Sequence, residues 1–528
     1  MRIAFIVPLE LGAVGCRLLS SHLRAHGHET RLIFIPDLVT SLAEKANLSG
    51  NPDPGPELCP LPVKERILAM VSDCDLIGFH VLSLFFSPLA EISAYLRAHA
   101  GIPVIWGGVH ATMAVDLCMP YTDFACIGDG EALLLELLER LASDQTYTAI
   151  QGLVYWDQGV VRHNPHRAGQ DNLDAYPFPD YSFQEHYLLF AHTDGEPRAI
   201  PVTPDNYGQY QKRYPSLEGG VTLVPYKTVS TRGCPFVCTY CSMGTQGGEQ
   251  YPFRTRSPEN IVDELVEVLN RFGDKIDVIS ISDDTFLSHS QTWLKRFAAE
   301  YKRRVKKPFR ILGFPLNIHR EAIEDLVEAG CMHIGVGVES LSRRILFDVY
   351  KRRTKPESVI EAANVLVEIS RRHGVLPPTF DVIYSNPYET LEDMLASIRG
   401  MSRIRHPFKI VLFKLSFFPN TELFQMAVRD GYIRPDDPAC YNQWVGEMDG
   451  NQTFVPILYE TIWKGQASER FVAFFIRPAV FTALNKQCNQ HPRFQRWLRS
   501  FLPGLARAVT HRYVFWFLRQ EILKSFRR

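Results

Sequence analysis

The sequence has little net charge, few cysteines for its length and no long apolar run. Its 57 lysines and arginines nearly balance 58 aspartates and glutamates, so the bulk positive charge of a nucleic-acid binder is absent. No run of about 18 consecutive apolar residues indicates a membrane span, and Met1–Pro8 lacks the length and the cleavage site of a signal peptide. Eleven cysteines in 528 residues fall short of the density of a disulfide-rich secreted protein. We therefore expect a cytoplasmic protein with reduced thiols that does not bind nucleic acid.

Hydrophobic residues make up 46% of the chain and charged residues 22%, which is typical of globular proteins. At this length two or three domains, each with its own core, are expected. Changes in hydrophobic periodicity divide the chain into four regions. We predict an N-terminal α/β domain over residues 1–150, a connector over 151–220, a second α/β domain over 221–420 and a helical C-terminal region over 421–528.

Strand and helix patterns alternate through residues 1–150. Compact apolar runs at Ile3–Val7 and Leu76–His80 are typical of strands, and helical patterns follow them. This alternation predicts a doubly wound parallel sheet with a ligand crevice at the carboxyl ends of its strands. Gly107 and Gly108 follow another strand and allow a flat ligand to approach the backbone closely. No G-x-G-x-x-G follows the first strand, which argues against a dinucleotide.

Repeated β/α units over residues 221–420 predict a partial TIM-type barrel, with chemistry at the carboxyl rim of its strands. An amphipathic helix is expected from Glu259 to Phe272, with Ser257 as its N-cap and Pro258 at its first position. Taken singly, an acidic residue after a strand is more often a turn or helix cap. Here polar residues follow three of the predicted strands, and these are Asp283, Asp284, Glu339, Ser340, Asn386 and Glu389.

Three cysteines with C-x3-C-x2-C spacing lie in the stretch T-R-G-C-P-F-V-C-T-Y-C-S-M-G, which begins at Thr231. The short segments between Cys234, Cys238 and Cys241 let three thiolates converge on one metal centre. A structural zinc usually takes four protein ligands, and the sequence offers no second C-x2-C pair to complete such a site. A disulfide would leave an odd cysteine. Three thiolates on a 4Fe–4S cluster leave one iron open to a small molecule.

This stretch resembles the cluster loop of the radical S-adenosylmethionine (SAM) enzymes. The resemblance implies that the open iron chelates SAM and that an electron donor such as flavodoxin or ferredoxin reduces the cluster. Cleavage of SAM then releases a 5′-deoxyadenosyl radical. The aromatic Tyr240, just before the last cysteine, matches a family position near the adenine.

The resemblance extends to the rim of the predicted barrel. Asp283 and Asp284 match positions near the methionyl ammonium of SAM, where a carboxylate suits a cation. Glu339 and Ser340 match a segment that hydrogen-bonds the ribose. The run from Asn386 to Glu389 matches the loop that flanks the adenine, although Gly-x-Pro is more usual there. These assignments are implied by the family and not by the spacing itself.

The N-terminal region resembles the cobalamin-binding domain that precedes the barrel in one subclass of these enzymes. The resemblance rests on Leu76–His80, on the G-G-x-H-A-T loop that begins at Gly107 and on the G-D-G-E turn that ends at Glu131. The D-x-H-x-x-G loop, whose histidine ligates cobalt in other cobalamin proteins, is absent. The subclass commonly lacks it too and holds the lower face of cobalamin free of a protein histidine. The resemblance places five residues around the corrin and its nucleotide tail, and these are Ser83, Gly107, Gly108, His110 and Thr112.

The alternative for this region is a Rossmann-like domain that binds no cobalamin. Its glycines would then form tight turns, and His110 would be a hydrogen-bonded loop histidine. The adjacent cluster motif and the order of the elements favour the cobalamin interpretation.

The resemblance spans about residues 1–420 and implies a cobalamin-dependent radical SAM methyltransferase acting on an unactivated carbon. The deoxyadenosyl radical would abstract hydrogen, methylcobalamin would deliver the methyl group, and a second SAM would remethylate the cobalt. No side chain is needed as a nucleophile, so none is assigned a catalytic role. Two alternatives stay open: a cobalamin-binding radical enzyme that cyclises or rearranges its substrate, and a non-catalytic cobalamin-binding sensor. We expect a small-molecule, natural-product or lipid-like substrate.

The C-terminal residues 491–528 carry nine lysines and arginines against one glutamate, with aromatic residues between them. A basic helix with aromatic side chains can lie on an anionic membrane surface. The alternative, which we favour, is a closing helix with aromatics in the core and charges in water. Peripheral membrane contact would favour a lipid-like substrate.

Overall fold

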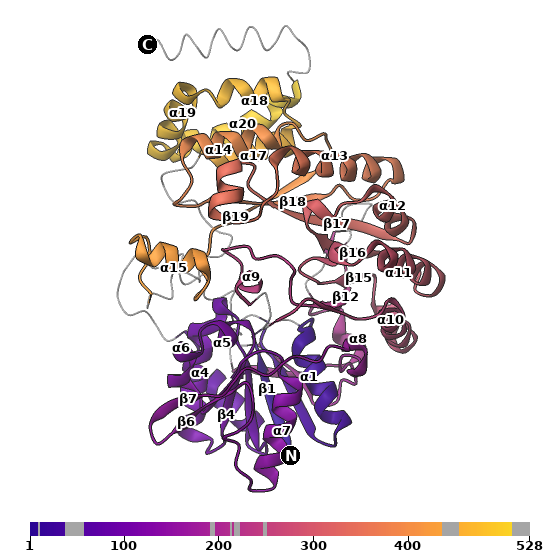
Figure 1. Ribbon diagram of the computed structural model, residues 1–528, viewed down its shortest axis with the longest axis vertical. Coiled ribbons are helices and arrows are strands. Elements are labelled where there is room, and N and C mark those ends of the chain that lie inside the picture. Colours follow the sequence, from indigo (N-terminus) through magenta and orange to yellow (C-terminus); the bar gives the residue numbers. More distant parts are fainter. Residues whose placement is uncertain are drawn as a thin grey trace. The chain divides into compact units, whose positions relative to one another are not determined.

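The structure is a computed structural model that describes residues 1–8, 11–36, 38, 58–190, 196–211, 214–215, 222–246, 251–435 and 454–508. The chain divides into two compact units. Unit 1 consists of Met1–Arg310 and Phe417–Asn442, and unit 2 consists of Ile311–Ser416 and Gln443–Arg528. Each unit is therefore built from two separate stretches of sequence, whose elements are labelled in Figure 1.

Unit 1 begins with a nine-stranded sheet in the order β7-β6-β5-β4-β3-β1-β2-β8-β9. The central strands β1 to β5 and the outer strand β8 run parallel. The strands β6, β7 and β9 pair antiparallel at the two edges. The predicted doubly wound parallel sheet is confirmed at the centre of this arrangement. The strands are β1 (Arg2–Val7), β2 (Glu29–Phe34), β3 (Leu76–His80), β4 (Val104–Gly107), β5 (Phe124–Cys126), β6 (Leu153–Asp157), β7 (Val160–His163), β8 (His186–Phe190) and β9 (Arg198–Pro201).

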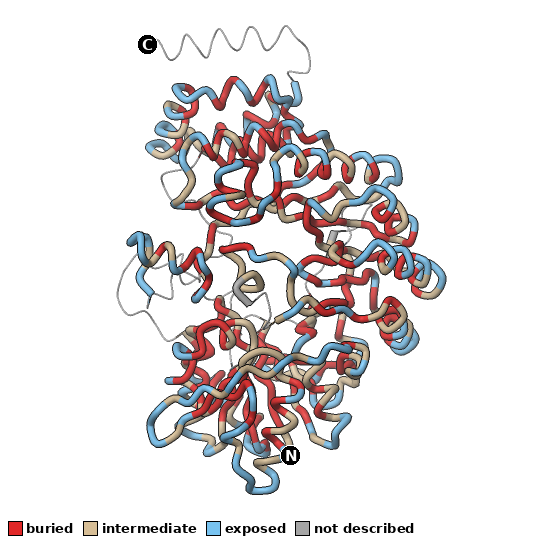
Figure 2. The backbone as a smooth tube through the Cα atoms, viewed as in Figure 1, coloured by how far each residue is buried: buried red, intermediate tan, exposed pale blue. Residues whose placement is uncertain are grey.

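Helices cover the strands of this sheet, which explains their continuous apolar runs. Ile3, Ile6, Ile33 and Ile77 are fully buried, and the strands are red over most of their length in Figure 2. Helix α1 packs beside α7, and α3 packs beside α4. The helices of this part are α1 (Val14–Ala25), α3 (Leu61–Val71), α4 (Phe86–His99), α5 (Val109–Met113), α6 (Val115–Cys118), α7 (Glu131–Ala142) and α8 (Pro204–Tyr207).

The stretch predicted as a connector contributes four strands to the sheet. The hairpin of β6 and β7 pairs with β5, and β8 pairs with β2 before β9 folds back on it. These strands cover both edges of the parallel centre, which would otherwise expose unpaired backbone groups. The proline-bearing composition of residues 196–220 concealed only β9, whereas β6, β7 and β8 precede that stretch and were assigned to the connector together with it.

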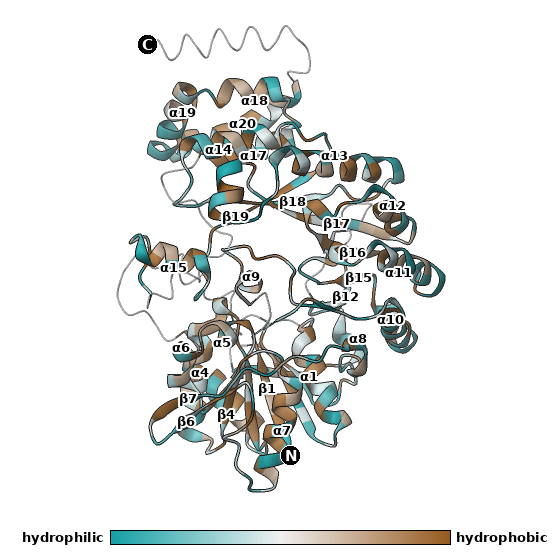
Figure 3. Ribbon diagram, in the orientation of Figure 1, coloured by the Kyte–Doolittle hydropathy of each residue, from teal (hydrophilic) through white to brown (hydrophobic). Residues whose placement is uncertain are grey.

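The second part of unit 1 continues with alternating strands and helices. β12 (Pro225–Thr228) runs parallel to β15 (Val278–Ile281), and β15 runs parallel to the start of β16 (Phe309–Gly313), whose residues from Ile311 on are assigned to unit 2. Helices α10 (Pro258–Phe272) and α11 (Gln291–Arg304) pack side by side. Figure 3 shows both with brown and teal faces. The predicted cap of α10 is confirmed, since the hydroxyl of Ser257 accepts a hydrogen bond from the Asn260 amide at 3.1 Å.

Smaller elements complete unit 1 around the cysteine motif. Strands β13 and β14 flank it in sequence and pair as an antiparallel ribbon, and β10 and β11 form a separate antiparallel pair earlier in the chain. Helix α15 comes from the second stretch of unit 1. These elements are β10 (Tyr214–Pro215), β11 (Thr222–Leu223), β13 (Thr231–Arg232), α9 (Ser242–Gln246), β14 (Arg254–Thr255) and α15 (Glu422–Arg429).

Unit 2 contains three further parallel strands and a group of helices. β17 (Cys331–Glu339) pairs with β18 (Thr379–Ser385), which pairs with β19 (Lys409–Lys414). Helix α17 packs against α20 and β19, so the predicted helical C-terminal region is confirmed over its described residues. None of the helices in the described residues has the length and apolar character needed to cross a membrane. The helices are α12 (Arg320–Glu328), α13 (Pro356–His373), α14 (Leu391–Met401), α17 (Phe454–Gly465), α18 (Glu469–Phe475), α19 (Pro478–Gln490) and α20 (Pro492–Ala508).

Candidate functional site

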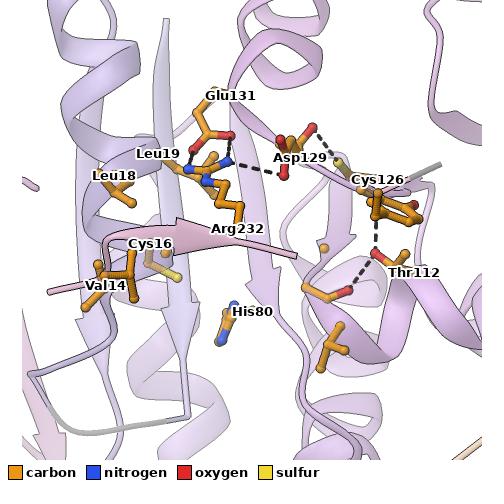
Figure 4. A pocket seen from close by; sticks show the side chains of 18 of the residues that line it. Val14, Cys16, Leu18, Leu19, His80, Thr112, Cys126, Asp129, Glu131 and Arg232 are labelled. Atoms are coloured by element: carbon orange, nitrogen blue, oxygen red, sulfur yellow. Dashed lines mark hydrogen bonds and ion pairs between the residues drawn. The ribbon is translucent and has the colours of Figure 1, made fainter. Parts of the chain in front are cut away.

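A cavity of about 360 Å³ in unit 1 lies at the carboxyl ends of the central strands. From β1 the sheet continues to β2 on one side and through β3 to β4 on the other. The crevice between β1 and β3 is therefore the topological switch point, where sheets of this class bind ligands. The cavity is lined by the start of α1, by the strand ends and by the ribbon that precedes the cysteine motif, as shown in Figure 4.

The structure brings part of the predicted cobalamin set to this cavity. Gly107, Gly108 and Thr112 line it, whereas Ser83 and His110 are not among its lining residues. His110 is fully buried, and its Nδ1 lies 2.9 Å from the Ser83 hydroxyl. Burial lowers the pKa of His110 to about 4, so its ring is neutral. These two residues hold each other behind the cavity, as the hydrogen-bonded loop histidine of the alternative interpretation would.

Thr112 fixes the two glycine turns of the cavity to one another. Its hydroxyl donates to the Gly108 carbonyl at 3.0 Å and accepts from the Gly128 amide at 3.1 Å. Gly108 has a φ of 102°, and a Cβ there would lie 2.9 Å from the Val81 carbonyl oxygen. Position 108 therefore requires glycine, because both the backbone conformation and the close approach exclude a side chain.

Buried ion pairs join the ribbon to the start of α7. Arg232 donates to Glu131 at 3.0 Å and lies 3.3 Å from Asp129, which also pairs with Arg254 at 2.8 Å. Only 3% of the Glu131 side chain is exposed. Burial opposes the charge of Arg232, but Glu131 and Asp129 outweigh it and keep the pKa of Arg232 above its ordinary value. Sequence reasoning singled out the G-D-G-E turn but not its arginine partners, which lie about 100 residues away.

The cysteine motif lies between β13 and α9. Cys238 is buried, while Cys234 and Cys241 are partly exposed, and none of the ten described cysteines forms a disulfide; Cys440 lies outside the described residues. Burial raises the pKa of the Cys241 thiol to about 12, against the opposing effect of the Gly244 and Met243 backbone. In the part of the chain that the structure describes, no three His, Cys, Asp or Glu side chains are grouped as a metal site. The three-cysteine ligand set stays a prediction.

Helix α15 and the residues just before it are tied to the motif and to α5. The Leu423 amide donates to the Thr239 carbonyl at 3.0 Å, within the motif. The Asn420 side chain donates to the Met113 carbonyl, at the end of α5. Tyr240 is partly exposed and is not among the cavity-lining residues. Its place near an adenine stays a prediction.

Asp283 fixes the backbone that leads into the motif. Its carboxylate accepts from the Ser230 amide at 2.7 Å, from the Thr231 amide at 3.0 Å and from the Ser230 hydroxyl. That hydroxyl also lies 2.8 Å from Nε2 of His289. Burial raises the pKa of Asp283, and the bonds to Ser230 oppose this rise. Asp283 therefore has a structural task that the sequence did not indicate.

Asp284 is the other carboxylate at the end of β15, and both aspartates line the cavity. Its side chain has no hydrogen bond among the described residues. Desolvation, with the charge of Asp283 second, raises the pKa of Asp284 to about 6. An approaching cation would favour the ionised form, so Asp284 suits the predicted ammonium contact better than Asp283 does.

Glu339 and Ser340 belong to unit 2, where Glu339 ends β17 and Ser340 follows it. Glu339 has a φ of 66° and lies 3.7 Å from Arg352, whose guanidinium packs over the Phe314 ring at 4.3 Å. The Ser340 hydroxyl is buried 2.9 Å from the Ser397 hydroxyl. The left-handed conformation of Glu339 is strained for a non-glycine residue, and such strain is concentrated at functional sites.

Asn386 and Glu389 follow β18 in the same unit. The Asn386 amide group donates to the Tyr350 hydroxyl at 3.0 Å, and the Glu389 backbone amide donates to the Asn386 carbonyl at 3.0 Å. Burial, with the charge of Asp393 second, raises the pKa of Glu389 to about 8. The roles of these residues toward SAM stay predictions.

The raised pKa of Glu389 predicts a pH-dependent stability. The folded chain binds this proton more tightly than the unfolded chain, so the stabilisation is complete below about pH 4.5 and is lost as the pH rises through about 8. Glu389→Gln should therefore gain about 1–3 kcal/mol relative to wild type between pH 4.5 and pH 8. Thermal unfolding of the cofactor-free protein at several pH values in this range measures the difference in stability between the variant and wild type. The exposed Glu392→Gln is the matched control, and a pH profile of Glu389→Gln parallel to that of wild type would contradict the prediction.

Comparison with known proteins places this geometry in context. The radical SAM superfamily profile matches residues 228–399. An uncharacterized methyltransferase of Pyrococcus horikoshii, PH0819, is 28% identical over 410 residues, which are 76% of this chain and 78% of that protein.

Two solved structures are similar over most of the chain. The cobalamin-dependent S-adenosylmethionine radical enzyme OxsB, with aqua-cobalamin bound, has a TM-score of 0.65 at 13% identity and covers 99% of this chain and 75% of its own. The radical SAM methyltransferase TsrM from Kitasatospora setae, with tryptophan and a SAM analogue bound, has a TM-score of 0.59 at 17% identity. The match covers 81% of this chain and 76% of TsrM. At these identities the similarity concerns the fold, and it confirms the predicted fold class.

Proposed function

Because residues 228–399 of this chain form a radical SAM domain, we propose that the protein is a cobalamin-dependent radical SAM enzyme that methylates an unactivated carbon. One observation carries the proposal. A single cavity is lined both by the strand ends of the N-terminal sheet and by Arg232 and Gly233, which directly precede Cys234. A ligand held at the switch point would thus lie beside the loop that is to hold the cluster.

When bound, the cluster would supply the electron that cleaves SAM, and cobalamin would supply the methyl group. The chain's own contribution is to hold and orient these groups. Cys234, Cys238 and Cys241 would ligate three irons. Asp283 fixes the backbone just before them through Ser230 and Thr231. Asp284 would accept a hydrogen bond from the ammonium group of SAM.

The cavity fits one face of a flat macrocycle. A Cβ on Gly15 would meet nothing within 4 Å, and one on Gly107 would meet only the Cys126 side chain, at 3.7 Å. Apolar side chains of α1, including Val14 and Leu18, complete the wall. A corrin with its side chains is larger than the cavity, so bound cobalamin would also contact residues beyond this lining.

The proposal is tested by anaerobic reconstitution with iron, sulfide and hydroxocobalamin, followed by desalting. We expect cobalamin and cluster absorption to be retained, 5′-deoxyadenosine to form from SAM under reduction, and SAM to methylate the reduced cobalamin. Absence of retained cobalamin overturns the methyl-transfer proposal. Retained cobalamin without SAM cleavage would indicate a sensor, and SAM cleavage without cobalamin methylation would indicate a cyclising or rearranging enzyme.

A small-molecule substrate and an external reductant accompany this chemistry. The reductant would be a flavodoxin or ferredoxin, because the cluster must receive single electrons. Reduced flavodoxin in the assay should replace dithionite as the electron source.

The membrane interpretation depends on helix α20, since residues 509–528 lie outside the described residues. Trp497 and Phe501 are 53% and 40% exposed, with ring centroids 4.8 Å apart, and Arg493 and Arg496 lie on the same helix. If α20 contacts anionic membranes, the double variant Trp497→Ser/Phe501→Ser should bind phosphatidylserine vesicles at least about tenfold more weakly than wild type. Co-sedimentation measures this, with neutral phosphatidylcholine vesicles as the control. Equal binding of both proteins would show that α20 is a closing helix with solvated charges.

A further inference from the structure

His80 places an imidazole in the cavity at the switch point of the sheet. It is the last residue of β3, which lies directly beside β1. In Figure 4 its ring lies in the cavity, between Cys16 of α1 and Thr112 of α5. The strands β1, β3 and β4 contribute six lining residues, of which His80 alone has a polar side chain: Phe5, Gly78, Phe79, His80, Ile105 and Gly107.

The chemical state of His80 suits a metal ligand. Burial lowers its pKa to about 4, so the ring is neutral at ordinary pH and keeps a lone pair on one nitrogen. The ring makes no hydrogen bond with the described residues. Its Nδ1 lies against Gly108, where a Cβ would approach it to 3.3 Å. Nε2 is therefore the nitrogen left to meet a ligand.

His110, the histidine named from the sequence, does not compete for this role. It is fully buried, lies against the Ser83 hydroxyl and is absent from the cavity lining. The two histidines thus differ in what surrounds them: His110 is held within the fold, and His80 faces the space where a ligand would lie.

We propose that His80 coordinates, through Nε2, the cobalt of a cobalamin bound in this cavity, as its lower axial ligand. This inference rests on the proposed function, because it requires cobalamin at the switch point. It departs from the expectation drawn from the resemblance, in which the lower face is free of a protein histidine. The histidine would reach the cobalt from the end of β3 and not from the loop after the first strand.

The test uses the full-length protein labelled with 15N-histidine and loaded with unlabelled hydroxocobalamin. After desalting, the cobalt is reduced to cob(II)alamin and its electron paramagnetic resonance spectrum is recorded. An axial 15N ligand splits each cobalt line into a doublet, whereas 14N gives a triplet. We expect a triplet in unlabelled protein and a doublet in labelled protein.

The other outcomes overturn the proposal in distinguishable ways. A triplet that persists in labelled protein identifies the cofactor's own dimethylbenzimidazole as the ligand, and no nitrogen splitting indicates water or an empty position. His80→Ala should retain cobalamin but lose the splitting, while His99→Ala, an exposed histidine on α4, should leave it unchanged. The labelled wild-type spectrum decides the matter even if His80→Ala fails to fold. Failure of wild type to retain cobalamin would instead overturn the proposed function.

Discussion

Alanine at Cys234, Cys238 and Cys241 is expected to abolish the cleavage of SAM. Thiolates are the ligands that hold an iron–sulfur cluster, and without them no electron can reach the sulfonium. We expect 5′-deoxyadenosine formation under reduction to fall by at least about 10³-fold, equivalent to about 4 kcal/mol of transition-state stabilisation. Iron and sulfide content, cluster absorption and chromatographic assay of 5′-deoxyadenosine measure the loss.

The matched control is Cys488→Ala, which removes a buried cysteine outside the motif. It should keep cluster content and SAM cleavage near those of wild type, apart from a modest loss of stability. If the triple variant kept both cluster absorption and 5′-deoxyadenosine formation, the three-cysteine ligand set would be wrong. A second readout, cobalamin retention, should survive in the triple variant because none of these cysteines lines the cavity.

Arg232→Ala is expected to destabilise the protein by about 3–5 kcal/mol, because it leaves buried Glu131 without its cationic partner. The ion pair sits where 18% of the arginine and 3% of the glutamate side chain are exposed. Asp129 keeps Arg254 as a partner at 2.8 Å, so the loss is concentrated on Glu131. Urea unfolding of the cofactor-free protein measures the difference.

The control and a double-mutant cycle separate charge from packing. Arg271→Ala removes an arginine that lies 3.9 Å from Glu267, with both side chains about half exposed, and should cost at most about 1 kcal/mol. Arg232→Ala/Glu131→Gln should recover a large part of the lost stability, because the buried and unpaired carboxylate of Glu131 has been removed. If the double variant were as unstable as the sum of the two single variants, the pair would not be coupled and the prediction would fail.

The cysteine spacing and the β/α periodicity predicted both the loop and the fold class, because these signals are local. Long-range contacts were not visible. Arg232 meets Glu131 across 101 positions, and Asp283 bonds Ser230 across 53. A carboxylate at a strand end can serve a ligand or the backbone, and only the folded geometry shows that Asp283 serves the backbone.

His80, which ends β3, and His110, which lies in α5 after β4, show the same limit. The sequence places both near a strand end, and the resemblance named His110 as a cobalamin contact but not His80. Which ring enters the cavity depends on side-chain direction, and the structure turns His110 toward Ser83. Strands β6 to β9 were assigned to the connector and not to the sheet, because which strand each one pairs with depends on long-range contacts that local periodicity does not show.

The return of the chain to unit 1 at Phe417 affects how the protein can be synthesised and divided. During translation the cysteine loop emerges from the ribosome well before Asn420 and Leu423, whose bonds tie α15 to Met113 and Thr239. The first unit cannot be complete until residues of the second have been made. A gene fragment ending near residue 310 would therefore express the cysteine loop without α15 and its bonds to Met113 and Thr239. Deleting the residues after 454 would leave α15 and these bonds in place.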